Sequence, residues 1–548
     1  SSNPARMGSV QKALRHLLVQ NSSDGVTPKP KKVLDTIMKS TFVSPEEKHG
    51  SYWKKVASDT IKMKLQERPN TNKAKNGILF IGDGMSLATV MAARTFEGQL
   101  DGSAGEENIL EFEKFPISGL ARTYCLDAQV PDSACTATSY LTGVKTKYGS
   151  CYPELHKGKL GYICNIFLFL SPGLVTTTRV THASPAGLYA HTSERNWESD
   201  ADVPDSCLQL GCQDIAYQLV MNDPGKKFKV ILGGGRKEFV QNLSNPLINS
   251  TGRRKDGIDL TEMWHIDKVQ KNFTHEFVTD RNELQKILKA ETLPEYILGL
   301  FHDDHMDYHL KSQNQPTLEE MVEVAIKFLS RSPKGYFLFV EGGRIDHAHH
   351  DSLAHLALDE TIEYSKAVKK ARSLTSEDDT LIVVSSDHAH TMTVAGYPSR
   401  GNDILSTVDT TNGLDGKPYT TISYANGKGI SIDVDGTRVD VTKHKQFLDR
   451  DLSYAYPGLV PLDSETHGGE DVAVFALGPW QHLFTASYEQ NLVPHLMAYA
   501  MCIGPEKHNN CKSKSRFNGF WTSSAVNHRP DVIPYVLIIC AVIVSCFR

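Results

Sequence analysis

The chain has 548 residues, which is long enough to bury a large core, so we expect one large domain with insertions. A hydrophobic content of 40% and a charged content of 22% are those of an ordinary globular protein. The net charge of −5 provides no broad basic surface, which excludes nucleic acid as an expected partner.

The chain begins with an expected N-terminal helical arm, residues 1–75, whose helix lies around Glu46–Leu65. The first residues are Ser1-Ser2, and no charged-then-apolar signal segment follows them. We therefore expect that the start of the protein is missing from this sequence.

Short apolar runs then alternate with segments whose apolar residues recur every 3.6 positions. The runs are 77–81, 174–180, 229–232, 336–340 and 381–384, and the helix-like segments include 318–329 and 352–372. This alternation predicts an α/β fold, doubly wound, with a mainly parallel central sheet flanked by helices. We assign this catalytic domain to residues 76–400 and 462–505, with its functional residues at the carboxyl ends of the strands.

Residues 401–461 break this rhythm and predict a small β-rich, crown-like inserted subdomain. Asn426-Gly427 and Asp435-Gly436 are typical hairpin turns within it. Another strand-like run follows at 472–477.

Carboxylates and imidazoles crowd the stretch Glu341–His350, directly after the buried run 336–340. This pattern predicts a metal site with Zn²⁺ and nearby Mg²⁺. Other strand ends carry matching chemistry. Asp83 lies between glycines, Ser133 stands at a helix start where an anion is stabilised, and Arg195 offers a planar fork to phosphate oxygens.

The order of these motifs resembles that of alkaline phosphatases, most closely the animal, insect-like, membrane-bound and GPI-anchored kind. The motifs are Gly82-Asp-Gly-Met85, Asp132-Ser-Ala-Cys-Thr-Ala-Thr138, Thr181-His-Ala-Ser-Pro185, Glu341–His350, Ser386-Asp-His-Ala-His390 and Thr466-His-Gly-Gly-Glu-Asp471. The resemblance runs from about Val33 to Cys511 and implies a homodimer that hydrolyses small phosphate monoesters at alkaline pH.

The resemblance also implies a role for each residue. Ser133 is the nucleophile that becomes phosphorylated, Arg195 binds two phosphate oxygens and Asp132 orients Arg195. The implied metal ligands are Asp346, His350 and His467 for a first zinc, Asp83, Asp387 and His388 for a second, and Asp83, Ser184 and Glu341 for magnesium. His182 and His347 are expected to contact these ligands without binding a metal themselves, and His349 and His390 are expected to be supporting residues.

Related activities fit less well. A sulfatase needs a Cys-x-Pro-x-Arg-like signature, which Cys135-Thr-Ala-Thr-Ser139 lacks. Phosphodiesterases of the superfamily use a threonine nucleophile and lack the arginine, so Arg195 favours monoesters. A calcium site of animal members is doubtful, because Leu300-Phe-His-Asp-Asp304 stands where their acidic residues lie.

Segment 149–173 departs from the family, since it is shorter and contains the apolar run Tyr162–Leu170. Because it lies between Ser133 and Ser184, we expect reduced stability and activity. The alternative function is therefore a catalytically impaired, membrane-anchored binding protein.

The carboxyl end predicts attachment to the extracellular face of the cell membrane. After a linker, 506–531, the tail 532–548 contains the uncharged run Val532–Phe547, which is marginal for a spanning helix. Small residues at 523–525 resemble a GPI-attachment signal, with Ser523 as the candidate site; a short membrane anchor is the alternative.

Sequons and cysteines also suggest secretion. The candidate glycosylation sites of the catalytic domain are Asn242, Asn249 and Asn272, and Asn21 is a further sequon. Cys502 and Cys511 flank a short polar loop and are expected to form a disulfide. Cys207 and Cys212 are candidates to pair with Cys151 or Cys164, and the connectivity is open.

Overall fold

The computed structural model describes residues 45–151, 170–241, 244–245, 250–433, 435–504 and 507–511. The chain divides into two compact units, 1–508 and 509–548, and the described part of the second is a 3₁₀ turn, Asn509–Cys511. The anchor tail, Ser523, Asn242 and Asn249 lie outside the described residues. Among the helices that are described, none is long and apolar enough to cross a membrane.

A ten-stranded sheet in the order β17-β2-β16-β10-β1-β9-β3-β4-β8-β7 forms the centre of the first unit. Its strands are β1 (Asn76–Gly82), β2 (Ile117–Arg122), β3 (Ser171–Arg179), β4 (Val230–Gly234), β7 (His275–Val278), β8 (Tyr296–Leu300), β9 (Tyr336–Gly342), β10 (Thr380–Ser385), β16 (Val472–Leu477) and β17 (Ala486–Glu489). β16 is antiparallel to β10 and β2, whereas the run from β10 to β7 is parallel. The predicted, mainly parallel sheet is thus confirmed.

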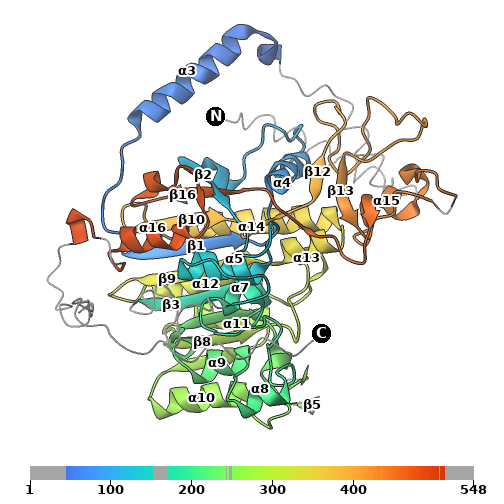
Figure 1. Ribbon diagram of the computed structural model, residues 1–548. Helices are drawn as coiled ribbons and strands as arrows, with labels where there is room; N and C mark the ends of the chain where they lie inside the picture. Colours follow the sequence, from blue (N-terminus) through green and yellow to red (C-terminus); the bar gives the residue numbers. More distant parts are fainter. Residues whose placement is uncertain are drawn as a thin grey trace, which may run out of the picture. The chain divides into compact units, whose positions relative to one another are not determined.

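Helices cover both faces of this sheet (Figure 1). The helices of the described residues are α3 (Gly50–Gln66), α4 (Leu87–Leu100), α5 (Ser133–Thr142), α7 (Ala183–Ala186), α8 (Asp205–Gln209), α9 (Ile215–Met221), α10 (Leu260–Gln270), α11 (Arg281–Lys289), α12 (Leu318–Leu329), α13 (Arg344–His350), α14 (Ala354–Ser373), α15 (Lys445–Asp449) and α16 (Leu492–Met501). Because successive strand residues point to opposite faces, Ile78 and Phe80 pack with α4, α12 and α14, while Leu79 and Ile81 pack with α5, α9, α10 and α16. Burial on both faces explains why these strands are continuously apolar.

The β-like region contains a three-stranded sheet of β12 (Met392–Val394), β13 (Ile422–Gly427) and β14 (Gly458–Pro461). The turn at Asp435-Gly436 is confirmed, since Asp433 donates its N–H to Thr437 and Gly436 has a φ of +78°. The predicted hairpin at Asn426-Gly427 is wrong: these residues end β13, whose next partner β14 runs parallel to it. The division of the chain into functional segments stays a prediction.

The cysteines differ in part from expectation. A disulfide that was not foreseen joins Cys125 to Cys135. Cys151, Cys207 and Cys212 are free, so the expected pairing with Cys151 is wrong, and Cys164 lies outside the described residues. Cys502 and Cys511 are each disulfide-bonded.

Candidate metal centre

Adjacent parallel strands bring the predicted site residues together at one edge of the sheet. The central order β10-β1-β9-β3 places the carboxyl ends of these strands side by side. Asp387 follows β10, Asp83 follows β1, Glu341 lies in the last part of β9, and His182 follows β3. This is the edge at which ligands bind in open α/β sheets.

A first group of possible ligands consists of Asp346, His350, His390 and His467. Asp346 and His350 lie one turn apart on α13, and the Nε2 atoms of His350 and His467 are 3.1 Å apart. Nδ1 of His350 is 2.5 Å from the Glu465 carbonyl oxygen, and Nδ1 of His467 is 2.7 Å from that of Pro131. Since both Nδ1–H groups donate to carbonyls, both Nε2 atoms are left as acceptors that can bind a metal.

A second group surrounds Ser133. Its Oγ lies 3.2 Å from Nε2 of His388. The same Nε2 atom is 3.1 Å from Oδ2 of Asp387 and 3.5 Å from Oδ1 of Asp83. Asp387 is itself fixed by the backbone N–H groups of Gly84 and His388. The serine hydroxyl therefore lies beside an imidazole and carboxylates, the donor set that Zn²⁺ prefers.

A third group lies deeper, around Glu341. Its Oε2 accepts hydrogen bonds from the hydroxyls of Thr176 and Thr178, the latter at 3.0 Å. Asp83 and His182 approach it closely enough to share a metal ion, and the fully buried Ser184 follows on α7. A set dominated by oxygen atoms suits Mg²⁺.

Burial makes this collection of carboxylates costly without a cation. Both oxygens of Asp83 and Oε1 of Glu341 accept no hydrogen bond from the described residues. Burial, with the neighbouring charges of Asp387, Asp346 and Glu341, raises the pKa of Asp83 well above its usual value. Burial likewise raises the pKa of Asp387 to about 6 and that of Glu341 to about 7. Bound cations would reverse these shifts by pairing with the ionised forms.

The N-terminus of α5 carries Ser133 and is capped by Asp132. The Asp132 carboxylate accepts the N–H groups of Ala134 and Cys135, each at 3.2 Å. Its Oδ2 also accepts from Nη1 of Arg195 at 3.0 Å. Capping by Asp132 is thus coupled to the position of the arginine, beside a helix end that favours anions.

Gly149, the first residue of the atypical segment 149–173, contacts both Asp132 and Arg195. Gly149 donates its N–H to Oδ1 of Asp132 at 3.0 Å, and its carbonyl accepts the N–H of Arg195 at 3.1 Å. Gly149 has a φ of +74°, which a side chain would strain. The described start of the segment therefore holds Asp132 and Arg195 together, and residues 152–169 lie outside the described ranges.

The remaining histidines of the predicted stretch have other contacts. His182 Nε2 lies 3.2 Å from Nη2 of Arg195, and burial, followed by the charge of Arg195, holds the pKa of His182 well below its usual value. His347 packs against His182 and His305 with ring centroids 5.5 and 4.2 Å away. His349 points elsewhere and contacts Thr89 and the Tyr424 hydroxyl.

Sequence reasoning gave His390 a supporting role and missed Glu465 and His305. His390 Nε2 is 2.7 Å from Oδ1 of Asp346, and its Nδ1 is 2.5 Å from Oε2 of Glu465. Burial alone would lower the pKa of His390, but these carboxylates raise it to about 10. The signal available for Glu465 was its position in the sequence, two residues before His467. His305 follows β8, a strand that the apolar pattern did not identify.

Known proteins share this sequence over most of its length. A model of the alkaline phosphatase family matches residues 74–503. The membrane-bound alkaline phosphatase of Bombyx mori is 46% identical over 488 residues, which cover 85% of this chain and 88% of that protein. The tissue-nonspecific alkaline phosphatase isozyme of Rattus norvegicus is 42% identical over 520 residues, with coverages of 91% and 96%.

Solved structures share the fold. The alkaline phosphatase of Thermus thermophilus gives a TM-score of 0.56 at 21% identity, covering 80% of this chain and 94% of its own. A mutant of TAB5 alkaline phosphatase with Mg bound in its M3 site gives 0.55 at 21% identity, covering 79% and 99%.

Proposed function

The chain belongs to the alkaline phosphatase family and is an enzyme that hydrolyses phosphate monoesters, and we propose that it does so at alkaline pH through a phosphoserine at Ser133, with two zinc ions and one magnesium ion. The observation that carries the proposal is the position of Ser133. Ser133 is the first residue of α5, and its hydroxyl oxygen lies 3.2 Å from Nε2 of His388. Carboxylates lie around this hydroxyl, and the ion pair of Asp132 and Arg195 lies beside it.

The donor sets fit the metals that the proposal requires. Unsatisfied carboxylate oxygens on Asp83 and Glu341 support a cation among them. We assign Asp346, His350 and His467 to the first zinc, Asp83, Asp387 and His388 to the second, and Asp83, Glu341 and Ser184 to magnesium. When bound, such ions lower the pKa of a coordinated hydroxyl or water and stabilise negative charge on phosphoryl oxygens. A calcium site is not part of the proposal.

The protein's own groups orient the reacting atoms. The Asp132 cap fixes the first turn of α5, and with it the hydroxyl of Ser133. The hydroxyl loses its proton to solvent and its oxygen attacks phosphorus, the bond from phosphorus to the leaving group breaks, and the leaving alkoxide takes a proton from solvent, so that Ser133 becomes phosphorylated. Water then displaces the serine oxygen and releases inorganic phosphate.

Arg195 is assigned to the phosphate oxygens. Its guanidinium is oriented from one side by Asp132 at 3.0 Å and from another by His182 at 3.2 Å. A planar fork held in this way presents parallel N–H groups to two oxygens of a tetrahedral phosphoryl group. A monoester has three oxygens free of ester bonds and carries two negative charges, whereas a diester has two such oxygens and one charge, so the cationic fork of Arg195 favours monoesters.

The alternative of an impaired binding protein has less support. Gly149, the first residue of the departing segment, bonds to both Asp132 and Arg195 rather than displacing them. The nucleophile helix is capped and buried in the same arrangement. These contacts favour an active enzyme.

We further propose a GPI-anchored, glycosylated homodimer at the extracellular face of the cell membrane. The apolar tail of the sequence and the membrane-bound relative from Bombyx mori support the anchor. α3 supports the dimer, since none of its residues is buried and it exposes Trp53, Ile61, Met63 and Leu65. Asn272, which lies at an exposed turn with a φ of +56°, is a glycosylation candidate.

Trapping the covalent intermediate tests the proposal. The purified full chain, loaded with zinc and magnesium, is mixed with a phosphate monoester at mildly acidic pH, quenched with acid and digested. Mass spectrometry should detect phosphate on the peptide that contains Ser133. Turnover without any phosphorylation of this peptide, with phosphate on another residue, would contradict the assignment.

A further inference from the structure

The Cys125–Cys135 disulfide closes a loop at the edge of the metal centre. The cysteines are 10 positions apart in sequence, and their Cα atoms are 5.9 Å apart. Cys125 follows β2, and Cys135 lies in the first turn of α5, two residues after Ser133. A bond in this position fixes the loop at its start and at the helix that carries the serine.

Residues inside this closed loop provide several parts of the proposed site. The carbonyl of Pro131 accepts the Nδ1–H of His467 at 2.7 Å. Asp132 orients Arg195 at 3.0 Å, and Ser133 is the proposed nucleophile. A shift of the loop would therefore move the nucleophile and disturb the support of a proposed zinc ligand and of the arginine, whose backbone N–H stays bonded to Gly149 outside the loop.

Cys135 contacts the residue on which this arrangement depends. Its N–H donates to Oδ1 of Asp132 at 3.2 Å, and its Sγ lies 3.4 Å from the Asp132 carbonyl oxygen. At the other end, the N–H of Cys125 donates to the carbonyl of Ala128 at 3.0 Å. The disulfide thus links the helix turn that Asp132 caps to Cys125 at the start of the loop.

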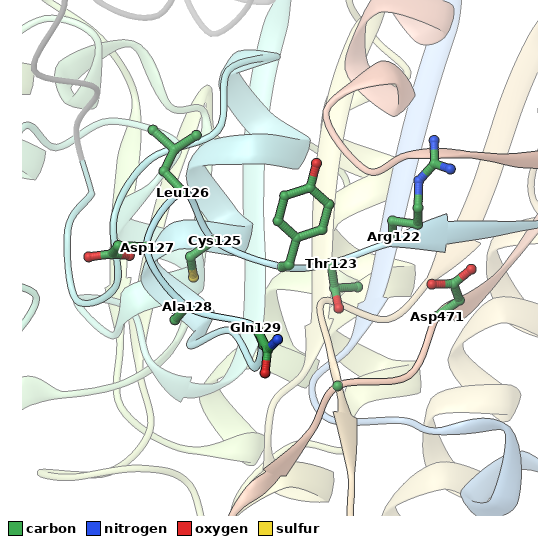
Figure 2. Close-up of a pocket in the computed structure, with 10 residues that line it drawn as sticks. Arg122, Thr123, Cys125, Leu126, Asp127, Ala128, Gln129 and Asp471 are labelled. Atoms are coloured by element: carbon green, nitrogen blue, oxygen red, sulfur yellow. The ribbon is translucent and has the colours of Figure 1, made fainter.

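Cys125 is one of the residues that line a surface pocket (Figure 2). It has a volume of about 540 Å³ and is lined by residues 122–129 with Gly469 and Asp471. Cys125 is among these residues, whereas Cys135 is not. Tyr124 and Leu126, which also line the pocket, are 43% and 60% exposed, so the pocket opens to solvent. Cys125 and Cys135 are themselves 3% and 1% exposed, so a small molecule in the pocket meets the disulfide only on its Cys125 side.

We propose that Cys125–Cys135 is a site of thiol–disulfide exchange whose intact bond holds the nucleophile loop in its working position. The proposal rests on the proposed role of Ser133. A small thiolate attacks Sγ of Cys125, the S–S bond breaks, and Cys135 leaves as a thiolate that takes a proton from solvent. A second thiolate then attacks the mixed disulfide, which frees the Cys125 thiol and yields the disulfide of the small thiol.

Opening the bond should slow turnover more than it weakens substrate binding. The open loop regains conformational freedom, and a displacement of Ser133 by about 1 Å can cost up to 100-fold in rate. We expect kcat to fall about tenfold or more, with a smaller change in KM, because Arg195 keeps the contact with Gly149. A purely structural disulfide would change the melting temperature and leave kcat per folded molecule unchanged.

Reduced glutathione provides the test on the full metal-loaded chain, with zinc and magnesium kept in excess. Alkylation and peptide mapping should show that Cys125–Cys135 opens as kcat falls, and oxidised glutathione should restore both. Cys125→Ala/Cys135→Ala should have the lowered kcat from the start and show no further response. Cys502→Ser/Cys511→Ser and Cys207→Ser should respond as the wild type does.

Two results would overturn the proposal: mapped opening of the bond with unchanged kcat, or a bond that glutathione does not open under conditions that reduce Cys502 and Cys511. A further loss of kcat when glutathione is added to the double variant, as large as the loss in the wild type, would also overturn it, because the effect would then arise at another site. If the double variant does not fold, titration of the wild type with mapping decides alone. Activity that survives in Ser133→Ala would instead refute the proposed function.

Discussion

Nη1 of Arg195 lies 3.0 Å from Oδ2 of Asp132, the residue whose carboxylate also caps the helix that begins with Ser133. One carboxylate thereby sets the distance between the proposed phosphate-binding guanidinium and the proposed nucleophile. Gly149 donates to the other oxygen of the same carboxylate at 3.0 Å and holds it in place. We therefore expect activity to depend on this pair as well as on the proposed metal ligands.

Arg195→Lys should lower kcat/KM for a phosphate monoester by roughly 10- to 100-fold, because an ammonium group cannot replace a planar fork between Asp132 and phosphate. Steady-state kinetics measure this loss. Arg281→Lys is the control, since Arg281 pairs with Glu320 on the surface. Equal kcat/KM values for Arg195→Lys and the wild type would remove the arginine from phosphate binding.

Asp83→Asn should stabilise the metal-free protein while it removes activity. Asp83 is fully buried among Asp387, Asp346 and Glu341, so loss of its charge relieves repulsion in the apo state. Metal addition should raise the melting temperature of the wild type by a few degrees or more, and that of the variant by much less. Asp101→Asn, at an exposed position, is the control. An apo variant that melts below the apo wild type would contradict this account.

Much of the site could be predicted because its residues directly follow recognisable apolar strands. Asp83, Glu341 and Asp387 come together since β1, β9 and β10 are adjacent and parallel. The same reasoning fails where three-dimensional pairing decides. The prediction of a hairpin at Asn426-Gly427 is wrong because these residues end β13, which pairs in parallel with β14. No sequence pattern indicates that the loop after β2 returns within disulfide distance of α5.

Glu465→Gln should weaken metal binding, because the Glu465 carboxylate contacts Nδ1 of His390, whose Nε2 lies 2.7 Å from Oδ1 of the proposed zinc ligand Asp346. The carboxylate also accepts the N–H of Thr391, whereas the backbone carbonyl that accepts Nδ1–H of His350 is unchanged in the variant. Loss of such support costs about 10- to 100-fold in metal affinity or activity. Activity titrated against free zinc measures the shift, and exposed Asp463→Asn is the control. An unchanged zinc titration would show that Glu465 does not position these ligands.

Glu360→Gln should flatten the pH dependence of stability. Burial, with the neighbouring charge of Asp359, raises the pKa of Glu360 from 4.5 to about 7. Because the folded state binds this proton more tightly than the unfolded chain does, the free energy of unfolding falls as pH rises from about 4.5 to about 7, by up to about 3 kcal/mol.

Chemical denaturation across this pH range measures that slope, with the exposed Glu262→Gln as the control. Glu360→Gln should lack the fall that the wild type and the control share. Identical slopes in all three proteins would show that Glu360 titrates at its usual pKa.

Hydrolysis of a chromogenic phosphate monoester by the purified full chain tests the central claim most directly. The wild type should be active with zinc and magnesium, lose activity with a chelator and regain it when the metals return. Ser133→Ala should fold, bind the metals and show no turnover above background. A folded, metal-loaded wild type without activity, or a Ser133→Ala variant with wild-type turnover, would contradict the account.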